Sequence, residues 1–280
     1  MSHIAVSSIL PTKAYNNLMI DHKANERAEL LDLKYKHLPA LSKILAAHEV
    51  ADFVELHLLH RHFSLREGEV VVHKTLRIPS QYDRDIVTSV DIAKVISCSE
   101  TIKASLAPIL WMSSSNSSLV AYEYGLLESA NPPKQSVASI SLKTWDLFSH
   151  DFSAYVHSEN IADIVSLKDK SYMQGGEYVV PDMRVVFRVP IGPITLQPGS
   201  GMHDSGWKLN AAMQLEPTDR HVTQTRKTAG GTVATYHKIT EAGIDTFDPK
   251  EISPWFTNPM WAAAKSDDFW VPSGIADVTA

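Results

Sequence analysis

Hydrophobic residues recur at helical spacing near the N-terminus and in short, strand-like runs over most of the remaining chain. After Asn25, apolar positions repeat every three or four residues, which is typical of an amphipathic helix. Asn25 is the expected N-cap, and Pro39 is expected either to kink this helix or to begin a second one. The apolar stripe consists of Leu30, Leu33, His37, Leu41 and Ile44.

Beyond residue 53, runs rich in β-branched and aromatic residues alternate with turn residues, which favours antiparallel strands. Arg220 to His237 is predicted to form a hairpin that turns at Gly230-Gly231, a dipeptide suited to a type I′ turn. The regular strand–helix alternation of a doubly wound fold is missing. The pattern therefore predicts one α+β domain over residues 1–280, with N-terminal helices followed by a mostly antiparallel sheet, sandwich or barrel-like.

The segment 53–74 is also predicted to be a β-hairpin, because two apolar runs flank the polar turn 65–68. Gly68 in this turn can adopt a positive φ. The alternation of strand side chains places His60 and His62 on one face and His57 on the other. If residue 64 pairs with residue 69, His60 also lies opposite His73, with Cβ atoms about 4.5–5.5 Å apart.

Three converging imidazoles would suit a metal ion, and zinc is the expected one. Neutral histidines bind zinc readily, and a catalytic zinc usually takes three protein ligands and water. The predicted ligands are therefore His60 and His62, completed by His73 or Glu123. A hydrogen-bonded core without a metal and a solvated strand face are the alternatives, the latter fitting His57 best.

Three residues are candidates for proton transfer beside such a metal. Glu123 lies in a Tyr-Glu-Tyr run predicted to be a strand, where it is either a partnered acid or an outward-facing edge residue. His203 and Asp204 lie in the glycine-rich segment 199–206, predicted to be a loop that could close over the site or form a plain surface turn.

Composition narrows the classes of partner. The formal net charge of −6 argues against a nucleic-acid or anionic-membrane partner. One cysteine, Cys98, excludes an intrachain disulfide, and the N-terminus lacks the features of a signal peptide, so a cytoplasmic protein is expected. Phosphate-binding, dinucleotide-binding and serine-hydrolase motifs are absent. The aromatic residues of segment 255–270 could line a ligand pocket or belong to the core. Oligomeric state stays open.

The runs Leu-Leu-His-Arg-His-Phe (58–63) and Glu-Gly-Glu-Val-Val-Val (67–72), with the Tyr-Glu-Tyr element, resemble a group of small fungal proteins of secondary metabolism. Within that group the chain is similar to the cyclopenase type, described as haemocyanin-like, zinc-binding lyases of quinolone-alkaloid biosynthesis. The resemblance implies ring contraction of a cyclopenin-type benzodiazepinedione epoxide to a viridicatin-type quinolone, with loss of methyl isocyanate. The substrate would be a small aromatic alkaloid. A metal-dependent hydrolase and a non-enzymatic small-molecule-binding protein are the alternatives.

Overall fold

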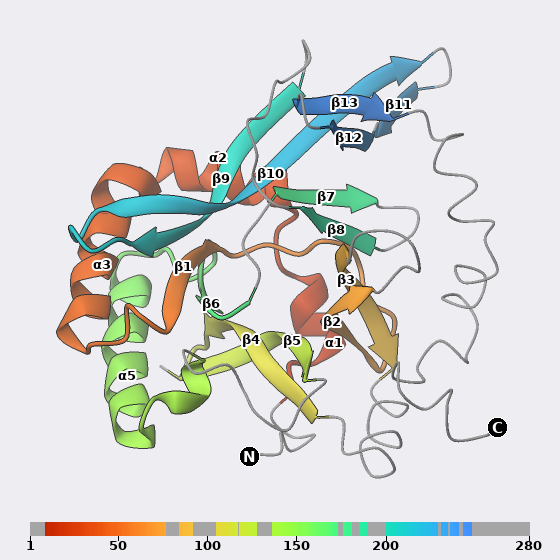
Figure 1. Cartoon of the computed structure of the whole chain (residues 1–280). Helices are drawn as coiled ribbons and strands as arrows, with labels where there is room; N and C mark the ends of the chain where they lie inside the picture. The colour runs from red at the N-terminus through yellow and green to blue at the C-terminus, as the bar shows by residue number, and fades with distance from the viewer. Residues whose placement is uncertain are drawn as a thin grey trace.

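The structure is a computed structural model in which N-terminal helices precede a large sheet (Figure 1). It describes residues 9–76, 84–91, 105–116, 118–127, 136–172, 176–180, 185–189, 200–228, 231–234, 236–240 and 243–247. The predicted α+β class with mostly antiparallel strands is confirmed. The predicted aromatic segment 255–270 lies outside the described residues. No helix in the described ranges is long and apolar enough to span a membrane.

The predicted helix boundaries agree with the structure at Pro39 but not at Asn25. Pro39 stands in the first turn of α3, so the predicted second helix is confirmed. The first long helix begins at Asp21, not at the predicted N-cap Asn25, whose amide instead donates to Glu29 within the helix. Leu30 is 85% exposed, so the apolar stripe starts later than predicted. The helical elements are α1 (Thr12–Asn16), α2 (Asp21–Leu30), the π-helical turn η2 (Leu33–His37), α3 (Leu38–Ala47), the 3₁₀ turn η3 (Val137–Ser139) and α5 (Leu142–Ser158).

Eleven strands form one sheet, in the order β11-β10-β7-β8-β3-β2-β5-β4-β6-β1-β9. Because β9 also pairs with β10, every strand of this order except β11 belongs to a closed ring of pairings. Only two of these pairings, β2–β5 and β10–β7, are parallel in the described part. The strands are β1 (Val54–Leu58), β2 (Glu69–Leu76), β3 (Arg84–Asp91), β4 (Ser105–Ser113), β5 (Leu119–Leu127), β6 (Val165–Asp169), β7 (Gly176–Val180), β8 (Val185–Val189), β9 (Ser200–Leu209), β10 (Leu215–Thr228) and β11 (Gly231–Ala234). A separate pair joins β12 (Tyr236–Thr240) to β13 (Gly243–Phe247).

The predicted hairpin over residues 53–74 is wrong. β1 pairs with β6 and β9, whereas β2 pairs with β3 and β5, so the two strands are not partners. Between them the chain runs through a nonhelical connection, in which the backbone N–H of Arg61 donates to Met19 rather than to a facing strand. Gly68 does adopt a positive φ, of 79°, at the turn that leads into β2. The second predicted hairpin is confirmed in part, because β10 pairs antiparallel with β11. The pairing places Gly231 opposite Thr228 as the first residue of β11 and not in the turn, and His237, the predicted end of the hairpin, lies in β12, which pairs with β13.

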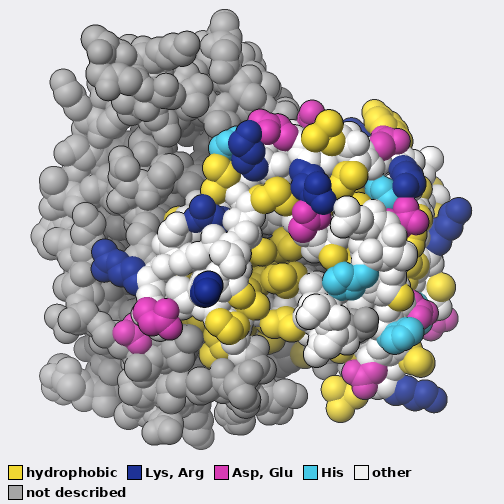
Figure 2. Space-filling model, turned by 180° about the vertical axis from the view of Figure 1, so that it is seen from behind, with side chains coloured by type: hydrophobic (Ala, Val, Ile, Leu, Met, Phe, Trp, Pro, Cys, Tyr) yellow, Lys and Arg dark blue, Asp and Glu magenta, His cyan; other side chains and the backbone are white. Residues whose placement is uncertain are grey.

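Two hydrophobic clusters cover opposite sides of the ring strands. The larger one packs α2, α3 and α5 against the strands and includes Phe148 and Phe152 of α5 and Leu56 and Leu58 of β1. Glu55 and His57 alternate with these leucines on β1 and are equally buried on the other face. The interior side therefore holds polar groups as well as a second apolar cluster. From behind, hydrophobic side chains gather in the middle of the described surface, with charged and histidine side chains around them (Figure 2).

Candidate metal centre

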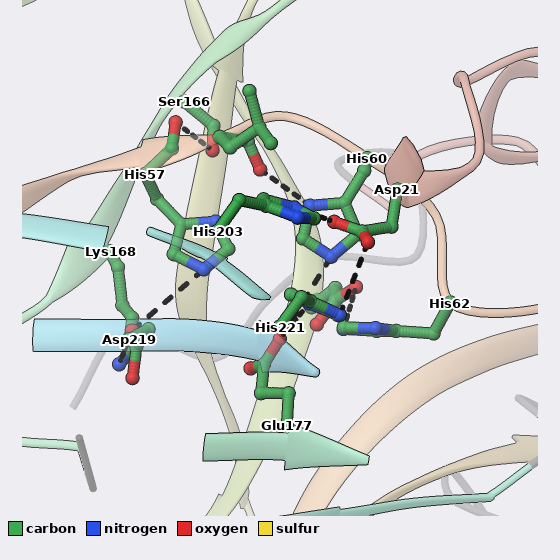
Figure 3. A network of polar contacts seen from close by, with 12 residues as sticks. Asp21, His57, His60, His62, Ser166, Lys168, Glu177, His203, Asp219 and His221 are labelled. Carbon is green, nitrogen blue, oxygen red and sulfur yellow. Dashed lines mark hydrogen bonds and ion pairs between the residues drawn. The ribbon is translucent and has the colours of Figure 1, made fainter. Parts of the chain in front are cut away.

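Three histidines and one glutamate converge in the interior (Figure 3). His60 and His62 come from the connection between β1 and β2, Glu177 from β7 and His221 from β10. One ligand atom from each residue lies within 4.8 Å of every other. The parallel pairing of β10 with β7 sets His221 directly beside Glu177, which explains how residues far apart in sequence meet. The structure thus holds a buried group able to bind one metal ion.

The rings of the three histidines are arranged around a common point. The centroid of His60 lies 4.6 Å from that of His221 and 4.8 Å from that of His62, and both rings stand at right angles to it within about a degree. The Nε2 atom of His221 is in direct contact with Oε2 of Glu177, and Nε2 of His60 lies 3.9 Å from the same oxygen. None of the four side chains is more than 7% exposed.

His60 is held in the form that a metal requires. Its Nδ1 lies 2.7 Å from the carbonyl oxygen of Leu58, which can only accept, so Nδ1 carries the proton. Nε2 then bears the lone pair, and this atom is buried without a hydrogen-bond partner. Burial, reinforced by the neighbouring His221 and His62, lowers the pKa of His60 to about 3, so the ring stays neutral.

The other two histidines each face a carboxylate on their outer side. Nε2 of His62 lies 3.5 Å from Oε1 of Glu123, and Nδ1 of His221 lies 3.5 Å from Oδ2 of Asp21. An N–H at Nε2 of His62 would serve Glu123 and leave Nδ1, which is buried without a hydrogen-bond partner, as the electron-pair donor. Metal-binding histidines almost always have such outer partners, which fix the tautomer and the ring orientation.

The histidines also hold the two outer carboxylates in their ionised form. Burial alone would raise the pKa of Asp21 and Glu123, but the neighbouring histidines outweigh it and lower both values below the usual range. His221 and the hydrogen bond from His203 lower the pKa of Asp21, while His62 and His73 act on Glu123. Ionised carboxylates inside a protein need opposite charge close by. His203 and His221 lie beside Asp21, and His62 and His73 lie beside Glu123.

The predicted ligands divide between two adjoining groups. His60 and His62 belong to the converging cluster. His73 and Glu123 form a pair with 2.6 Å between Nε2 and Oε2, and Glu123 reaches the cluster through His62. The hydroxyl of Tyr15 also donates to Glu123 over 3.3 Å. The Tyr-Glu-Tyr run is a strand, β5, and Glu123 is fully buried rather than an outward edge residue.

The predicted loop around His203 and Asp204 is wrong, because both residues lie in strand β9. Antiparallel pairing with β10 holds this glycine-rich segment in the sheet, with two register shifts opposite Gly206. Nε2 of His203 lies 2.8 Å from Oδ1 of Asp21, and its ring stacks on His221 at 5.8 Å. Asp204 instead pairs with Arg220, at 3.1 Å, and with Lys34, at 3.7 Å.

Sequence reasoning missed Glu177 and His221. Both stand in runs that are typical of ordinary strands. The available signal was an ionisable residue next to strand-forming residues, Glu177 before Tyr178 and His221 before Val222, with His221 two residues after Asp219. That signal cannot say which strands become neighbours.

Comparison of the chain with protein-family models, with curated proteins and with solved structures finds no match.

Proposed function

We propose that this protein is a metal-dependent enzyme that acts on a small molecule, with one divalent ion held by His60, His62, Glu177 and His221. The observation that carries the proposal is the state of His60. Its Nδ1 is committed to a carbonyl oxygen, and its buried Nε2 has no hydrogen-bond partner and faces three further ligand groups. A core held only by hydrogen bonds would leave that nitrogen unsatisfied, at a cost of about 1–3 kcal/mol.

Zinc is the proposed ion, because imidazole nitrogens and one carboxylate are ligands that it accepts. Four protein ligands complete a tetrahedral zinc, so a reaction would require a fifth position or release of one ligand. Glu177 is the candidate for release, since carboxylates rearrange more easily than rings wedged against one another. Iron(II) or manganese, which prefer six positions, would leave two open with the same ligands. Elemental analysis of the purified protein distinguishes these cases.

The proposed reaction is a ring contraction of the cyclopenase type, supported by the resemblance of segments 58–63 and 67–72. Conversion of a cyclopenin-type epoxide into a viridicatin-type quinolone and methyl isocyanate conserves all atoms, so it consumes neither water nor an oxidant. A bound divalent ion supplies Lewis-acid stabilisation of charge that develops on a carbonyl or epoxide oxygen. Glu123 and His203, next to His62 and His221, are the proposed proton-transfer residues. Asp204, paired with Arg220, is the weaker of the predicted candidates.

A hydrolase at the same centre is the second candidate, because the same ligands suit activation of water for attack on an ester or amide. Turnover in ¹⁸O-labelled water separates the two reactions. A hydrolase must place solvent oxygen in its product, whereas the ring contraction leaves the product unlabelled.

Metal analysis of protein purified without a histidine tag tests the proposal as a whole. We expect about one equivalent of metal in the wild type and strong loss in His60→Ala and His221→Ala. His150→Ala is the matched control, because His150 is a surface histidine with a side chain 72% exposed. Less than about half an equivalent in the wild type, unrestored by added zinc, iron(II) or manganese, would overturn the proposal.

A further inference from the structure

A second buried charged group lies beside the metal centre (Figure 3). Nζ of Lys168 lies 3.0 Å from Oε1 of Glu55 and 2.5 Å from Oδ2 of Asp219, and all three side chains are fully buried. Glu55 and Lys168 face each other on β1 and β6, while Asp219 comes from β10. One lysine thus joins three strands from the inside of the ring.

Burying such a triad contributes little net free energy to the stability of a fold. Buried ion pairs often contribute no more than apolar residues of the same volume, because charges lose their hydration. Their best-attested benefit is that they fix one arrangement of the chain among several.

Asp219 marks the irregular part of β10. The register of β10 against β9 shifts between Pro217 and Asp219 and again between Asp219 and Arg220. The two shifts are opposite, so Arg220 and His221 face Asp204 and His203 in the same register that Pro217 has with Trp207. Residues two apart on a strand point to the same face, so the side on which Asp219 is held is also the side on which His221 points.

The facing strand is built to receive Asp219 at this position. Gly206 of β9 lies so close that a Cβ atom there would be 2.8 Å from Oδ2 of Asp219 and 2.7 Å from Oγ1 of Thr218. The Asp219 carboxylate also lies 3.8 Å from Nε2 of His57, whose ring stacks on His60 at 5.5 Å. His57 therefore lies between the triad and His60, whereas His221 follows Asp219 two residues later on the same strand.

We propose that Lys168 is a positioning residue for the metal centre: by holding Asp219 inward at the irregular part of β10, it keeps His221, two residues later on the same face, directed at the ion. The inference rests on the proposed metal site. It assigns the buried triad a purpose that general stabilisation of the fold does not require, because its effect is directed at one ligand.

A double-mutant cycle with cobalt(II) as the probe tests this role. Co²⁺ affinity is measured for wild type, Lys168→Met, His221→Ala and the double variant, with circular dichroism to establish folding. Lys168→Met should weaken Co²⁺ binding about 10- to 100-fold in the wild-type background, as loss of an outer partner of a ligand does. In the His221→Ala background it should change affinity less than about twofold, because a residue that acts only through His221 has nothing left to position.

Lys170→Met is the matched control, since Lys170 lies two residues further along and donates to the carbonyl oxygen of Ala51 instead. It should leave Co²⁺ affinity unchanged. Asp219→Asn, which keeps the shape of the side chain, replaces Lys168→Met in the cycle if that variant does not fold. Equal losses of affinity in both backgrounds, or none in either, would overturn the positioning role while leaving the metal site intact. A wild-type protein that binds no Co²⁺ or other divalent ion would overturn both proposals.

Discussion

Replacing Glu123 by glutamine is the sharpest single perturbation of the region around the metal centre. Glu123 is fully buried and is the point where Tyr15, His62 and His73 meet. Glutamine keeps the shape of the side chain but removes the charge and turns one acceptor oxygen into an N–H donor. All three neighbours donate hydrogen bonds to Glu123. The NH₂ group of the glutamine, itself a donor, would therefore face another donor and lose that hydrogen bond.

The magnitude follows from these contacts. A hydrogen bond to a charged group contributes about 1.5–3 kcal/mol, and Glu123→Gln loses one or two of them. The free energy of unfolding should therefore fall by about 2–4 kcal/mol, as measured by urea denaturation in the presence of a chelator. Metal affinity should fall about 10- to 100-fold by calorimetric titration, because His62 loses the partner that orients its ring.

Glu159→Gln is the control for this experiment. Glu159 pairs with Lys36 at 2.8 Å, but both side chains are partly exposed, and such pairs contribute about 0–1 kcal/mol. If Glu123→Gln matches this control in both stability and metal affinity, then Glu123 has no part in orienting His62. A loss of stability with unchanged metal affinity would show that Glu123 stabilises the fold but does not orient His62.

Three further outcomes are expected. Chelation should lower the melting temperature, and free metal at 100 times its dissociation constant should restore about 2.7 kcal/mol, but not in His60→Ala. Phe152→Ala should lower the free energy of unfolding by about 3–5 kcal/mol in urea, because the ring is fully buried between α5 and the sheet and its loss opens a cavity. Burial lowers the pKa of His37, so the unfolded chain binds that proton more readily. Stability contributed by neutral His37 is thus present above about pH 6.5 and lost as pH falls, and His37→Gln should flatten the decline in denaturation midpoint on the acid side.

The sequence predicted those parts of the fold in which neighbouring residues determine the structure. Pro39 favours the start of a helix wherever the rest of the chain lies. The Gly230-Gly231 dipeptide likewise favours a chain reversal, and the pairing of β10 with β11 places this reversal one residue before the predicted position. The hairpin over residues 53–74 failed because its pattern is equally compatible with two strands that pair elsewhere. Both faces of β1 are buried, so Glu55 and His57 occupy a polar interior that alternation of apolar and polar residues cannot distinguish from a solvated surface.

For the candidate site, too, only the ligands that are close together in the sequence could be predicted. His60 and His62 lie two residues apart, and this spacing alone indicates a metal-ligand pair. Their partners Glu177 and His221 become neighbours only through the parallel pairing of β7 with β10, which depends on the whole topology. The predicted role of Glu123 came from its unusual place between two tyrosines, and the structure puts it against His62 from outside the cluster.

The spread of the ligand set along the chain has a consequence for biosynthesis. Because His60 and His221 are separated by most of the polypeptide, a nascent chain cannot assemble the full cluster until β10 has left the ribosome. Any product that ends before residue 221 offers at most three of the four ligand groups. With the proposed metal site, acquisition of the ion would be a late step that depends on completed topology, and metal content should track the fraction of molecules that have reached the native state.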